Sequence, residues 1–328
     1  MTFLAGIDIG GTKCAVCVGH LTGTGVTVLE KQRFPTPDSP AATLAQCTER
    51  LAGMTSAETP VRAIGISCGG PLDSREGLIL SPPNLPGWDR VDVVTPFYQR
   101  FDVPVALQND ANACALAEWR WGAGQGCRNI IFLTFGTGMG AGLILDGRLY
   151  SGTNDLGGEV GHIRLAEDGP VGYGKAGSFE GFCSGGGIAR LAQARARAAI
   201  REESPPSFCP SEADLPGITA ESVGRAAQRG DPLAVEIYET VGHYLGRGLA
   251  VLVDILNPER IIIGSIYPRQ RSLLESVMMR VLRDDALPGA LARCEIVPAG
   301  LGEQVGDLAS LAVAHMALAG EGDVVDGD

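Results

Sequence analysis

The sequence predicts an α/β protein built from two related halves. One observation is the stretch Leu4–Val18, in which an apolar run leads into Gly10-Gly11 and apolar residues resume directly after Lys13. Another is the similar pattern over Ile130–Gly147, where Gly136-Thr137-Gly138 separates two apolar runs. Each pattern is typical of a β-hairpin whose turn tolerates unusual backbone angles. The length of 328 residues allows about two domains, each with its own core.

The first half is expected to combine strands and helices in an α/β order. Its elements, in chain order, are the hairpin over 4–18, a strand over 26–30, a helix over 41–54, strands over 61–67 and 103–108, and a helix over 113–121. Ser39-Pro40 opens the first of these helices, because the fixed backbone angle of proline suits a first helical turn. Gly122 closes the second helix. Three strands, a helix and a strand describe one half of an α/β domain.

The second half is expected to be richer in helices. After the hairpin over 130–147, the expected elements are helices over 186–202, 219–229, 231–256 and 305–318, strands over 260–265 and 294–298, and an exposed polar loop over 204–217. Asp231 caps the long helix, Pro232 starts it, and Asn257-Pro258 stops it. The expected domains are a small one over 1–118, completed by the helix over 305–319, a large one over 119–304, and a frayed acidic tail over 320–328.

Composition excludes several classes of partner. The formal net charge is −12 and the sequence pI is near 4.9, which argues against nucleic acid or an anionic membrane surface. The most apolar later stretch, Leu249–Gly264, is interrupted by charged residues and cannot span a membrane. The chain starts directly with its first strand and no leader features, so a cytoplasmic protein with a small polar substrate is expected.

The nine cysteines have no paired spacing, apart from Cys14 and Cys17. Residues three apart on a strand point to opposite faces, so these two thiols cannot share a metal ion or form a disulfide. We interpret both as small core residues.

The first glycine turn has the composition of an anion site. Gly10, Gly11, Thr12 and Lys13 leave backbone N–H groups and a hydroxyl open to phosphate, and Asp8 could hold the hydrated cation that accompanies it. The motif is neither a Walker A loop nor a dinucleotide fingerprint. An ordinary hairpin with a surface aspartate explains this copy equally well, but the second copy favours phosphate binding.

Asp110 is the candidate proton acceptor. It stands where a strand ends and a helix begins, so its carboxylate can project from the carboxyl edge of a sheet. The alternative is that Asp110 only caps the helix that begins at Ala111. Because a helix N-terminus stabilises an anion, we expect an ionised carboxylate that is a weak base.

Four motifs, in this order, resemble those of the ROK family of sugar kinases and repressors: Asp8–Lys13, Asn109–Asn112, Gly136–Gly142 and Gly158–His162. The resemblance covers almost the whole chain. It implies the two-domain actin/Hsp70/sugar-kinase-like ATPase fold, with ribonuclease H-like halves and an interdomain cleft that closes on substrate. ROK repressors carry an additional N-terminal helix-turn-helix, for which we expect no room here, because the first turn falls within the first fifteen residues.

The resemblance also implies an activity, the ATP-dependent phosphorylation of a hexose at its 6-hydroxyl, glucose in the first place, with Asp110 as base. The implied sugar ligands are Gly70, Asn84, Asn109, Asp110, Glu159, His162 and Glu180, and the implied nucleotide ligands are Asp8, Gly10, Gly11, Thr12, Lys13, Gly136, Thr137, Gly138, Gly264 and Ser265. Asp8 would hold Mg²⁺ through water. Ser265 stands where a second glycine is more usual. Relatives are often dimers, so a homodimer is expected.

Other functions stay open at this point. A kinase for N-acetylmannosamine, N-acetylglucosamine or fructose is the nearest alternative. A non-catalytic sugar-binding regulatory protein and a chaperone-like ATPase are alternatives of other classes.

One departure from the family pattern concerns zinc. ROK enzymes commonly carry three cysteines after the histidine, which together with it bind structural zinc. In the matching run the cysteine positions hold Val171, Tyr173 and Ser178, although Cys183 is nearby. One imidazole cannot supply the four donors of a structural zinc site, so no zinc is expected.

Overall fold

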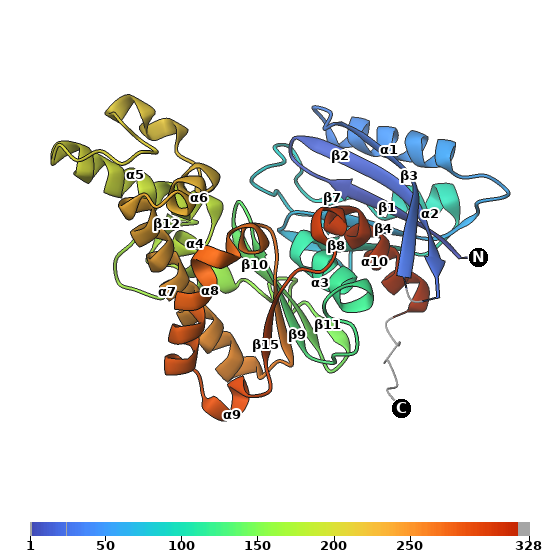
Figure 1. Ribbon diagram of the computed structural model, residues 1–328. Coiled ribbons are helices and arrows are strands. Elements are labelled where there is room, and N and C mark those ends of the chain that lie inside the picture. The colour runs from blue at the N-terminus through green and yellow to red at the C-terminus, as the bar shows by residue number, and fades with distance from the viewer. Residues whose placement is uncertain (1, 24, 321–328) are drawn as a thin grey trace. The chain divides into compact units, whose positions relative to one another are not determined.

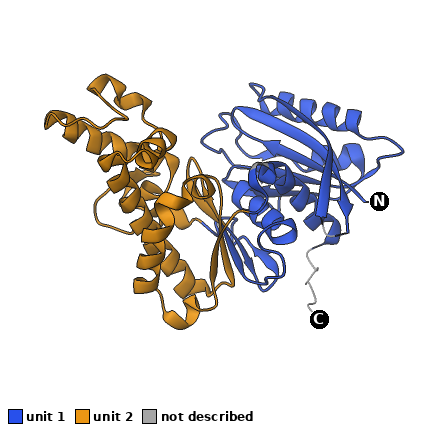
Figure 2. Cartoon of the chain, in the orientation of Figure 1, with its two compact units in different colours: residues 1–132, 142–158, 300–328 blue, residues 133–141, 159–299 orange. Residues whose placement is uncertain are grey.

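The computed structural model describes residues 2–23 and 25–320, so nearly all of the expected frayed tail lies outside the described residues. The chain forms two compact α/β units (Figure 2). Unit 1 comprises residues 1–132, 142–158 and 300–328, and unit 2 comprises residues 133–141 and 159–299. The predicted α/β class is confirmed, whereas the expected boundary between residues 118 and 119 stays a prediction.

Unit 1 is built on a five-stranded sheet with the order β3-β2-β1-β4-β8. Its strands are β1 (Phe3–Ile9), β2 (Lys13–Thr22), β3 (Gly25–Pro35), β4 (Val61–Cys68) and β8 (Val105–Asn109). The first three strands form an antiparallel meander, and β4 and β8 run parallel to β1. The predicted hairpin, its tight turn and the three later strands of this half are therefore confirmed.

Helices cover both faces of this sheet (Figure 1). On one face, Cys47 and Leu51 of α1 (Pro40–Met54) join the core with Ile7 and Ile9. On the other face lies α10 (Val305–Ala319), because Gly6 and Gly65 have no side chains and let it approach. Cys14 and Cys17 are both buried, and their sulfur atoms contact Thr36 and Ser310, respectively. Their interpretation as core residues is confirmed.

Unit 1 also contains elements that the sequence did not predict. Three short strands, β5 (Leu72–Asp73), β6 (Leu78–Ile79) and β7 (Val91–Asp92), form a small antiparallel sheet, and α2 (Thr95–Phe101) follows them. Strands of two residues carry too little alternation of apolar and polar residues to be recognised. The predicted helix after β8 is α3 (Asp110–Trp121), and it begins earlier than expected.

The second five-stranded sheet has the order β11-β10-β9-β14-β15. Its strands are β9 (Ile130–Phe135), β10 (Met139–Leu145), β11 (Arg148–Tyr150), β14 (Arg260–Ile263) and β15 (Glu295–Pro298). The predicted second glycine turn lies between β9 and β10.

Unit 2 is mainly helical, as expected. It contains η1 (Val160–His162), the small hairpin of β12 (Val171–Gly172) and β13 (Lys175–Ala176), α4 (Phe179–Phe182), α5 (Gly185–Arg201), η2 (Glu212–Gly217), α6 (Ala220–Gln228), α7 (Pro232–Leu256), α8 (Ile266–Asp285) and α9 (Pro288–Leu291). Asp231 caps α7 through Ala234, and Asn257 ends it in a left-handed conformation. The sequence did not predict α8, and η2 lies inside the stretch that was expected to be an irregular loop.

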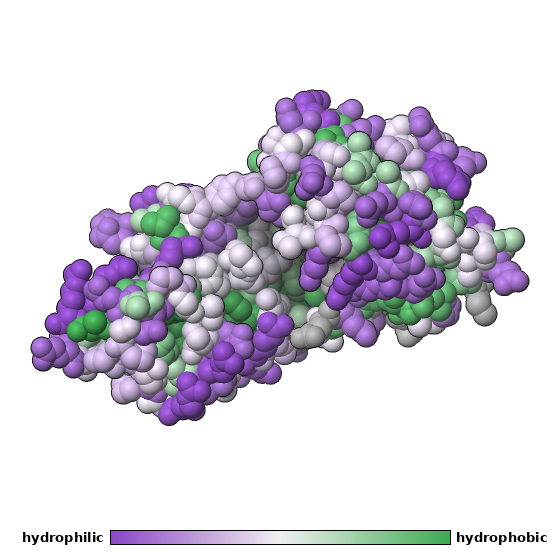
Figure 3. Space-filling view, turned by 90° about the horizontal axis from the view of Figure 1, so that it is seen from above, coloured by the Kyte–Doolittle hydropathy of each residue, from purple (hydrophilic) through white to green (hydrophobic). Residues whose placement is uncertain are grey.

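Hydrophilic residues cover much of the face that Figure 3 shows, in keeping with the acidic composition. Within residues 2–23 and 25–320, no helix combines the length and the apolar character that crossing a membrane requires.

The contact of α10 with the first sheet gives a test of the fold. A Cβ atom on Gly65 would lie 2.0 Å from the carbonyl oxygen of Ser310 and 2.2 Å from the nitrogen of Ala314. We expect Gly65→Ala to lower the free energy of unfolding by about 3 kcal/mol or more, because α10 must move away from β4. The measurement is equilibrium unfolding in urea.

The matched control is Gly53→Ala on the exposed side of α1, where no atom lies within 4 Å of the added methyl group. This change should leave stability unchanged or raise it by up to about 1 kcal/mol, because alanine favours a helix over glycine. Equal stabilities of the two variants would contradict the packing argument.

Candidate functional site

The carboxyl edge of the first sheet gathers the predicted site residues of unit 1. In the parallel register, Ile9 of β1 pairs with Cys68 of β4, and Cys68 pairs with Asn109 of β8. The three strands therefore end level with one another, and Gly10, Gly69 and Asp110 follow them at the same edge. In α/β sheets this edge is where ligands bind.

Asn84 reaches this edge from the proline-rich loop before β7. A Cβ atom on Gly11 would lie 2.2 Å from the carbonyl oxygen of Asn84, and one on Gly69 would lie 3.7 Å from its side-chain amide. Asn84 itself is exposed. Unit 1 thus brings together the first glycine turn, Gly69-Gly70, Asn84 and the pair Asn109-Asp110.

The hydrogen bonds of the first glycine turn leave its amides available. Gly10 N donates to Lys13 O at 3.2 Å, Thr36 Oγ1 donates to Gly10 O at 2.6 Å, and Thr36 N donates to Thr12 O at 3.1 Å. The carbonyls of Gly10, Thr12 and Lys13 are therefore occupied, whereas the N–H groups of Gly11 and Thr12 donate to no other described residue. Successive free N–H groups of this kind form a concavity that favours an anion.

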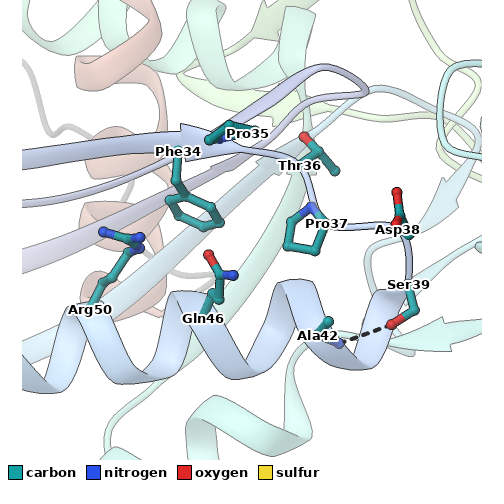
Figure 4. Close-up of a pocket in the computed structure, with 9 residues that line it drawn as sticks. All are labelled: Phe34, Pro35, Thr36, Pro37, Asp38, Ser39, Ala42, Gln46 and Arg50. Atoms are coloured by element: carbon teal, nitrogen blue, oxygen red, sulfur yellow. Dashed lines mark hydrogen bonds between the residues drawn. The ribbon is translucent and has the colours of Figure 1, made fainter.

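The segment that supports this turn has a cavity of its own on the side of α1 (Figure 4). The cavity, of about 550 Å³, is lined by Phe34, Pro35, Thr36, Pro37, Asp38, Ser39, Ala42, Gln46 and Arg50. A larger one in unit 1, of about 1240 Å³, lies along β8 and the start of β5. None of the predicted site residues lines either cavity. The candidate site therefore consists of the glycine turns and of the side chains at the carboxyl edge of the first sheet.

Asn109, the neighbour of Asp110, caps the helix α3. Asn109 Oδ1 accepts the N–H of Asn112 at 2.8 Å, which makes Asn109 the N-cap of α3. The alternative that Asp110 is the cap is therefore wrong. Asp110 is the first helical residue, its Oδ1 accepts the N–H of Ala111 at 2.8 Å, and its side chain remains accessible.

The basicity of Asp110 departs from the sequence-based expectation. The protein atoms around its carboxyl remove part of its hydration, and this raises the pKa of Asp110 above the ordinary value of 3.8, while the hydrogen bond from Ala111 opposes the shift. Desolvation outweighs the helix N-terminus. The carboxylate is a stronger base than the sequence led us to expect.

A buried carboxylate that the sequence analysis missed fixes the far end of the same helix. Glu118 is fully buried and accepts N–H groups from Ala123 at 2.8 Å, Gly300 at 3.0 Å and Leu301 at 3.0 Å. At the near end, a Cβ atom on Gly142 would lie 2.4 Å from Ala111 O, so β10 packs closely against the first turn of α3. Together these contacts hold the helix that carries Asp110.

Asp8 lies in an acidic environment within unit 1. Burial, and then the nearby charges of Asp110 and Asp307, raise the pKa of Asp8 to about 6, and Lys31 and Lys13 oppose the shift. Lys31 forms a half-buried ion pair with Asp307. A cation beside Asp8 would therefore relieve repulsion, as expected of a carboxylate that meets magnesium through water.

The second glycine turn repeats the hydrogen-bonding pattern of the first. Gly136 N donates to Gly138 O at 3.1 Å, and the start of α5 supplies Gly185 N to Gly136 O at 2.7 Å and Gly186 N to Thr137 O at 3.4 Å. In the described part of the chain, the N–H groups of Thr137 and Gly138 have no acceptor. Unit 2 thus contains a second turn suited to an anion.

The predicted sugar ligands of unit 2 adjoin this turn. Glu180, at the start of α4, accepts the N–H of Met139 at 3.1 Å. A Cβ atom on Gly161 would lie 2.2 Å from Met139 O and 3.2 Å from Glu180 Cβ, so η1 packs directly against the turn and α4. This packing places His162, which is half-buried, and Glu159, which is exposed, in the same region.

Gly264 and Ser265 also border the second turn. Gly264 N donates to Leu133 O at 2.9 Å, and the Ser265 hydroxyl lies 3.4 Å from where a Cβ on Gly136 would stand. Ser265 has φ 55° and ψ −100°, a conformation that normally requires glycine. A serine held in such a conformation next to a phosphate-type turn is typical of a functional position.

The residues at the positions where ROK enzymes commonly carry cysteines do not fit zinc. Val171 has no donor atom, and Ser178 Oγ caps α4 by accepting the N–H of Gly181 at 3.0 Å. Cys183 is buried, its thiol contacts Val241 O at 3.6 Å, and burial raises the pKa of the thiol well above its ordinary value. Over residues 2–23 and 25–320, no three His, Cys, Asp or Glu side chains are grouped to hold a metal ion.

The raised pKa of Asp8 predicts how stability depends on pH. The folded protein resists ionisation of Asp8 until about pH 6, whereas the unfolded chain ionises near 3.8, so this residue destabilises the ligand-free fold as pH rises through that window. Asp8→Asn should therefore raise the free energy of unfolding by on the order of 2 kcal/mol at neutral pH and by almost nothing below pH about 4.

Urea unfolding of the wild type and Asp8→Asn across this pH range measures the difference. Asp284→Asn, on the exposed side of α8, is the matched control and should follow the wild type. Parallel pH profiles of the wild type and Asp8→Asn would contradict the assignment.

Comparison with known proteins places the chain in a family. The family model described as "ROK family" matches residues 4–316. A glucokinase of Streptomyces coelicolor is 33% identical over 265 residues, which cover 80% of this chain and 82% of that protein. The repressor Mlc of Escherichia coli is 32% identical over 228 residues, which cover 69% of this chain and 54% of the repressor.

A solved structure agrees with these matches. The ROK family glucokinase from Streptomyces griseus, in complex with glucose and AMPPNP, has a TM-score of 0.74 and 31% identity, over 95% of this chain and 99% of that one. This likeness confirms the predicted two-domain actin/Hsp70-like fold. With a family model that spans nearly its whole length and relatives of both kinds, kinase and repressor, the chain belongs to the ROK family.

Proposed function

We propose that this protein is an ATP-dependent hexose kinase that phosphorylates the 6-hydroxyl of glucose. The observation that carries the proposal is the repeated pattern of the two glycine turns, each of which has two consecutive N–H groups without an acceptor among the described residues. Two such turns suit the several anionic groups of a nucleoside triphosphate. The likeness to a glucokinase that binds glucose and AMPPNP supports the same substrates.

In this proposal Asp110 receives the proton of the sugar 6-hydroxyl. The hydroxyl oxygen forms a bond to the γ-phosphorus of ATP, the bond from that phosphorus to the bridging oxygen of ADP breaks, and ADP leaves with the electron pair. The raised pKa of Asp110 suits this role, because a carboxylate with a higher pKa is a stronger base and accepts the proton of the hydroxyl more readily. Phosphoryl transfer otherwise depends on alignment and neutralisation of charge.

Charge neutralisation is assigned to the turns and to Mg²⁺. In unit 1, phosphate oxygens of ATP would accept hydrogen bonds from the N–H groups of Gly11 and Thr12 and from the ammonium of Lys13. In unit 2, they would accept hydrogen bonds from the N–H groups of Thr137 and Gly138. Mg²⁺ would be held by phosphate oxygens and water, with Asp8 accepting hydrogen bonds from that water. Gly264 and Ser265, which adjoin Gly136, are assigned to the adenosine.

The sugar hydroxyls are assigned to polar groups of both units. Asn109 Oδ1 is used by the helix cap, so its Nδ2 is the atom available to a hydroxyl. Glu180 accepts one N–H and retains further acceptor capacity, while Asn84 and Glu159 are exposed. Gly70 contributes its backbone and His162 its imidazole. A hydroxyl missing from the sugar would leave one of these groups unpaired, which is how such sites discriminate.

The main alternative is a sugar-binding protein without turnover, which the likeness to a repressor keeps in view. The presence of both turns and of an accessible Asp110 favours catalysis.

Replacing the proposed base separates these alternatives. Asp110→Asn should lower kcat for glucose by about a hundredfold or more, because the amide cannot accept the proton, while binding of glucose changes little. A coupled assay of ADP release gives kcat, and calorimetry gives the affinity. The control Asp284→Asn should retain full activity, and an active Asp110→Asn would show that another group accepts the proton.

A panel of sugars tests the substrate. Glucose, fructose, N-acetylglucosamine and N-acetylmannosamine are compared in one ADP-release assay, together with a reaction without sugar. We expect the highest kcat/KM with glucose and no turnover without sugar. Thermal stabilisation by sugar without any ADP release would identify a binding protein, and ADP release without sugar would identify a free-standing ATPase.

A further inference from the structure

The hairpin of β12 and β13 holds His162 at two points. The ring of Tyr173 meets the imidazole edge-on, with 5.0 Å between the ring centroids and 73° between the planes. Lys175 Nζ donates a hydrogen bond to the backbone carbonyl of His162 at 2.7 Å. One short hairpin therefore contacts both the side chain and the main chain of the same histidine.

The hairpin is itself fixed by the chain around it. Gly177 O accepts the N–H groups of Leu165 at 2.8 Å and Ala166 at 3.1 Å, and Gly177 N donates to Pro170 O at 3.2 Å. Ser178 Oγ lies 3.4 Å from Gly172 O and also caps α4. The backbone N–H and carbonyl of Gly177 and the hydroxyl of Ser178 are therefore paired within the protein, and the hairpin is held in place without a ligand.

Tyr173 is an exposed aromatic residue with an unfavourable backbone conformation. It is 68% exposed and has φ 45°, so it combines an unfavourable backbone conformation with a large aromatic ring in solvent. Nothing in the fold of the hairpin requires an aromatic ring at this position, because the pairs Val171–Ala176 and Gly172–Lys175 close the hairpin without it. The imidazole is the ring that it touches.

We propose that Tyr173 and Lys175 are positioning residues that hold His162 in place of a metal ion. Tyr173 fixes the direction of the imidazole, and Lys175 fixes the backbone from which it projects. The proposal rests on the proposed function in that His162 is taken as a ligand of the sugar. It follows from the donor set as well, since Val171, Ser178 and the neutral thiol of Cys183 do not fit zinc.

The kinetic test compares the effect on each substrate. Tyr173→Ala and Lys175→Met should each raise KM for glucose about fivefold or more and leave KM for ATP unchanged, because they loosen only the sugar-binding histidine. Tyr173→Phe should behave as the wild type. Tyr98→Ala, which removes another exposed tyrosine, is the matched control. A shift in both KM values, or in neither, would overturn the positioning role.

A second test does not depend on activity. The sequence has three lysines, Lys13, Lys31 and Lys175, so endoproteinase Lys-C can cut at few places. Cleavage after Lys175 reports opening of the hairpin, whereas Lys13 and Lys31 lie in the first sheet and report global unfolding. Tyr173→Ala should accelerate the first cleavage at least tenfold without accelerating the others. Equal cleavage of Tyr173→Ala, Tyr173→Phe and the wild type would overturn the proposal.

The metal arm uses the wild-type protein. Treatment with 1,10-phenanthroline should leave cleavage after Lys175 unchanged, and elemental analysis should find much less than one zinc per chain. One equivalent of zinc, with faster cleavage on its removal, would overturn the proposal. Because proteolysis and metal content need no turnover, a protein that phosphorylates no sugar would refute the proposed function while these two readouts still decide how the hairpin is held.

Discussion

The candidate site depends on hydrogen bonds that occupy backbone carbonyls. In both glycine turns, two carbonyl oxygens accept hydrogen bonds from a neighbouring segment: Gly10 O and Thr12 O from Thr36, and Gly136 O and Thr137 O from the N-terminus of α5. The N–H groups of Gly11 and Thr12, and those of Thr137 and Gly138, have no acceptor among the described residues. The glycines permit the turn, but the supporting segments decide which polar groups remain available. Thr36 and Gly185 therefore support the two turns through their hydrogen bonds to Gly10 and Gly136.

A second constraint is the level ending of parallel strands. Because β1, β4 and β8 stop at the same height, three segments that are far apart in sequence place their first loop residues at one edge. Asp110 occupies the start of a helix at that edge, and Asn109 satisfies the helix terminus in its place. Because Asn109 caps the helix, the carboxylate of Asp110 accepts only the N–H of Ala111 among the described hydrogen bonds and can accept further ones.

Periodicity and turn residues predicted most of the fold. The hairpins, the later strands of both sheets and the caps of α1 and α7 follow from local sequence, and each is present, whereas the parallel pairing of those strands was not predicted. The short strands β5 to β7 were missed because two-residue strands carry no pattern. The helix α8 was missed, although Ser265 precedes it, because Pro268 and a kink at Gln270 interrupt its helical pattern. Family motifs supplied the candidate site residues, which stay predictions, but they could not show that Asn109 is the cap or that desolvation dominates at Asp110. The role of Glu118 could not be predicted either, because a glutamate in a helix is ordinarily exposed and only the tertiary fold buries this one.

Glu118 has a consequence for the segment that leads into α10. Three N–H groups converge on its buried carboxylate, and two of them belong to Gly300 and Leu301. Releasing these donors would leave a buried charge and unsatisfied amides, at on the order of 1–3 kcal/mol for each group. The two residues are therefore ordered before any ligand arrives, and fixing a residue's backbone otherwise costs about 1–2 kcal/mol of conformational entropy. A ligand that bound to Gly300 and Leu301 would not have to order their backbone. Its affinity would therefore not be reduced by that loss of conformational entropy.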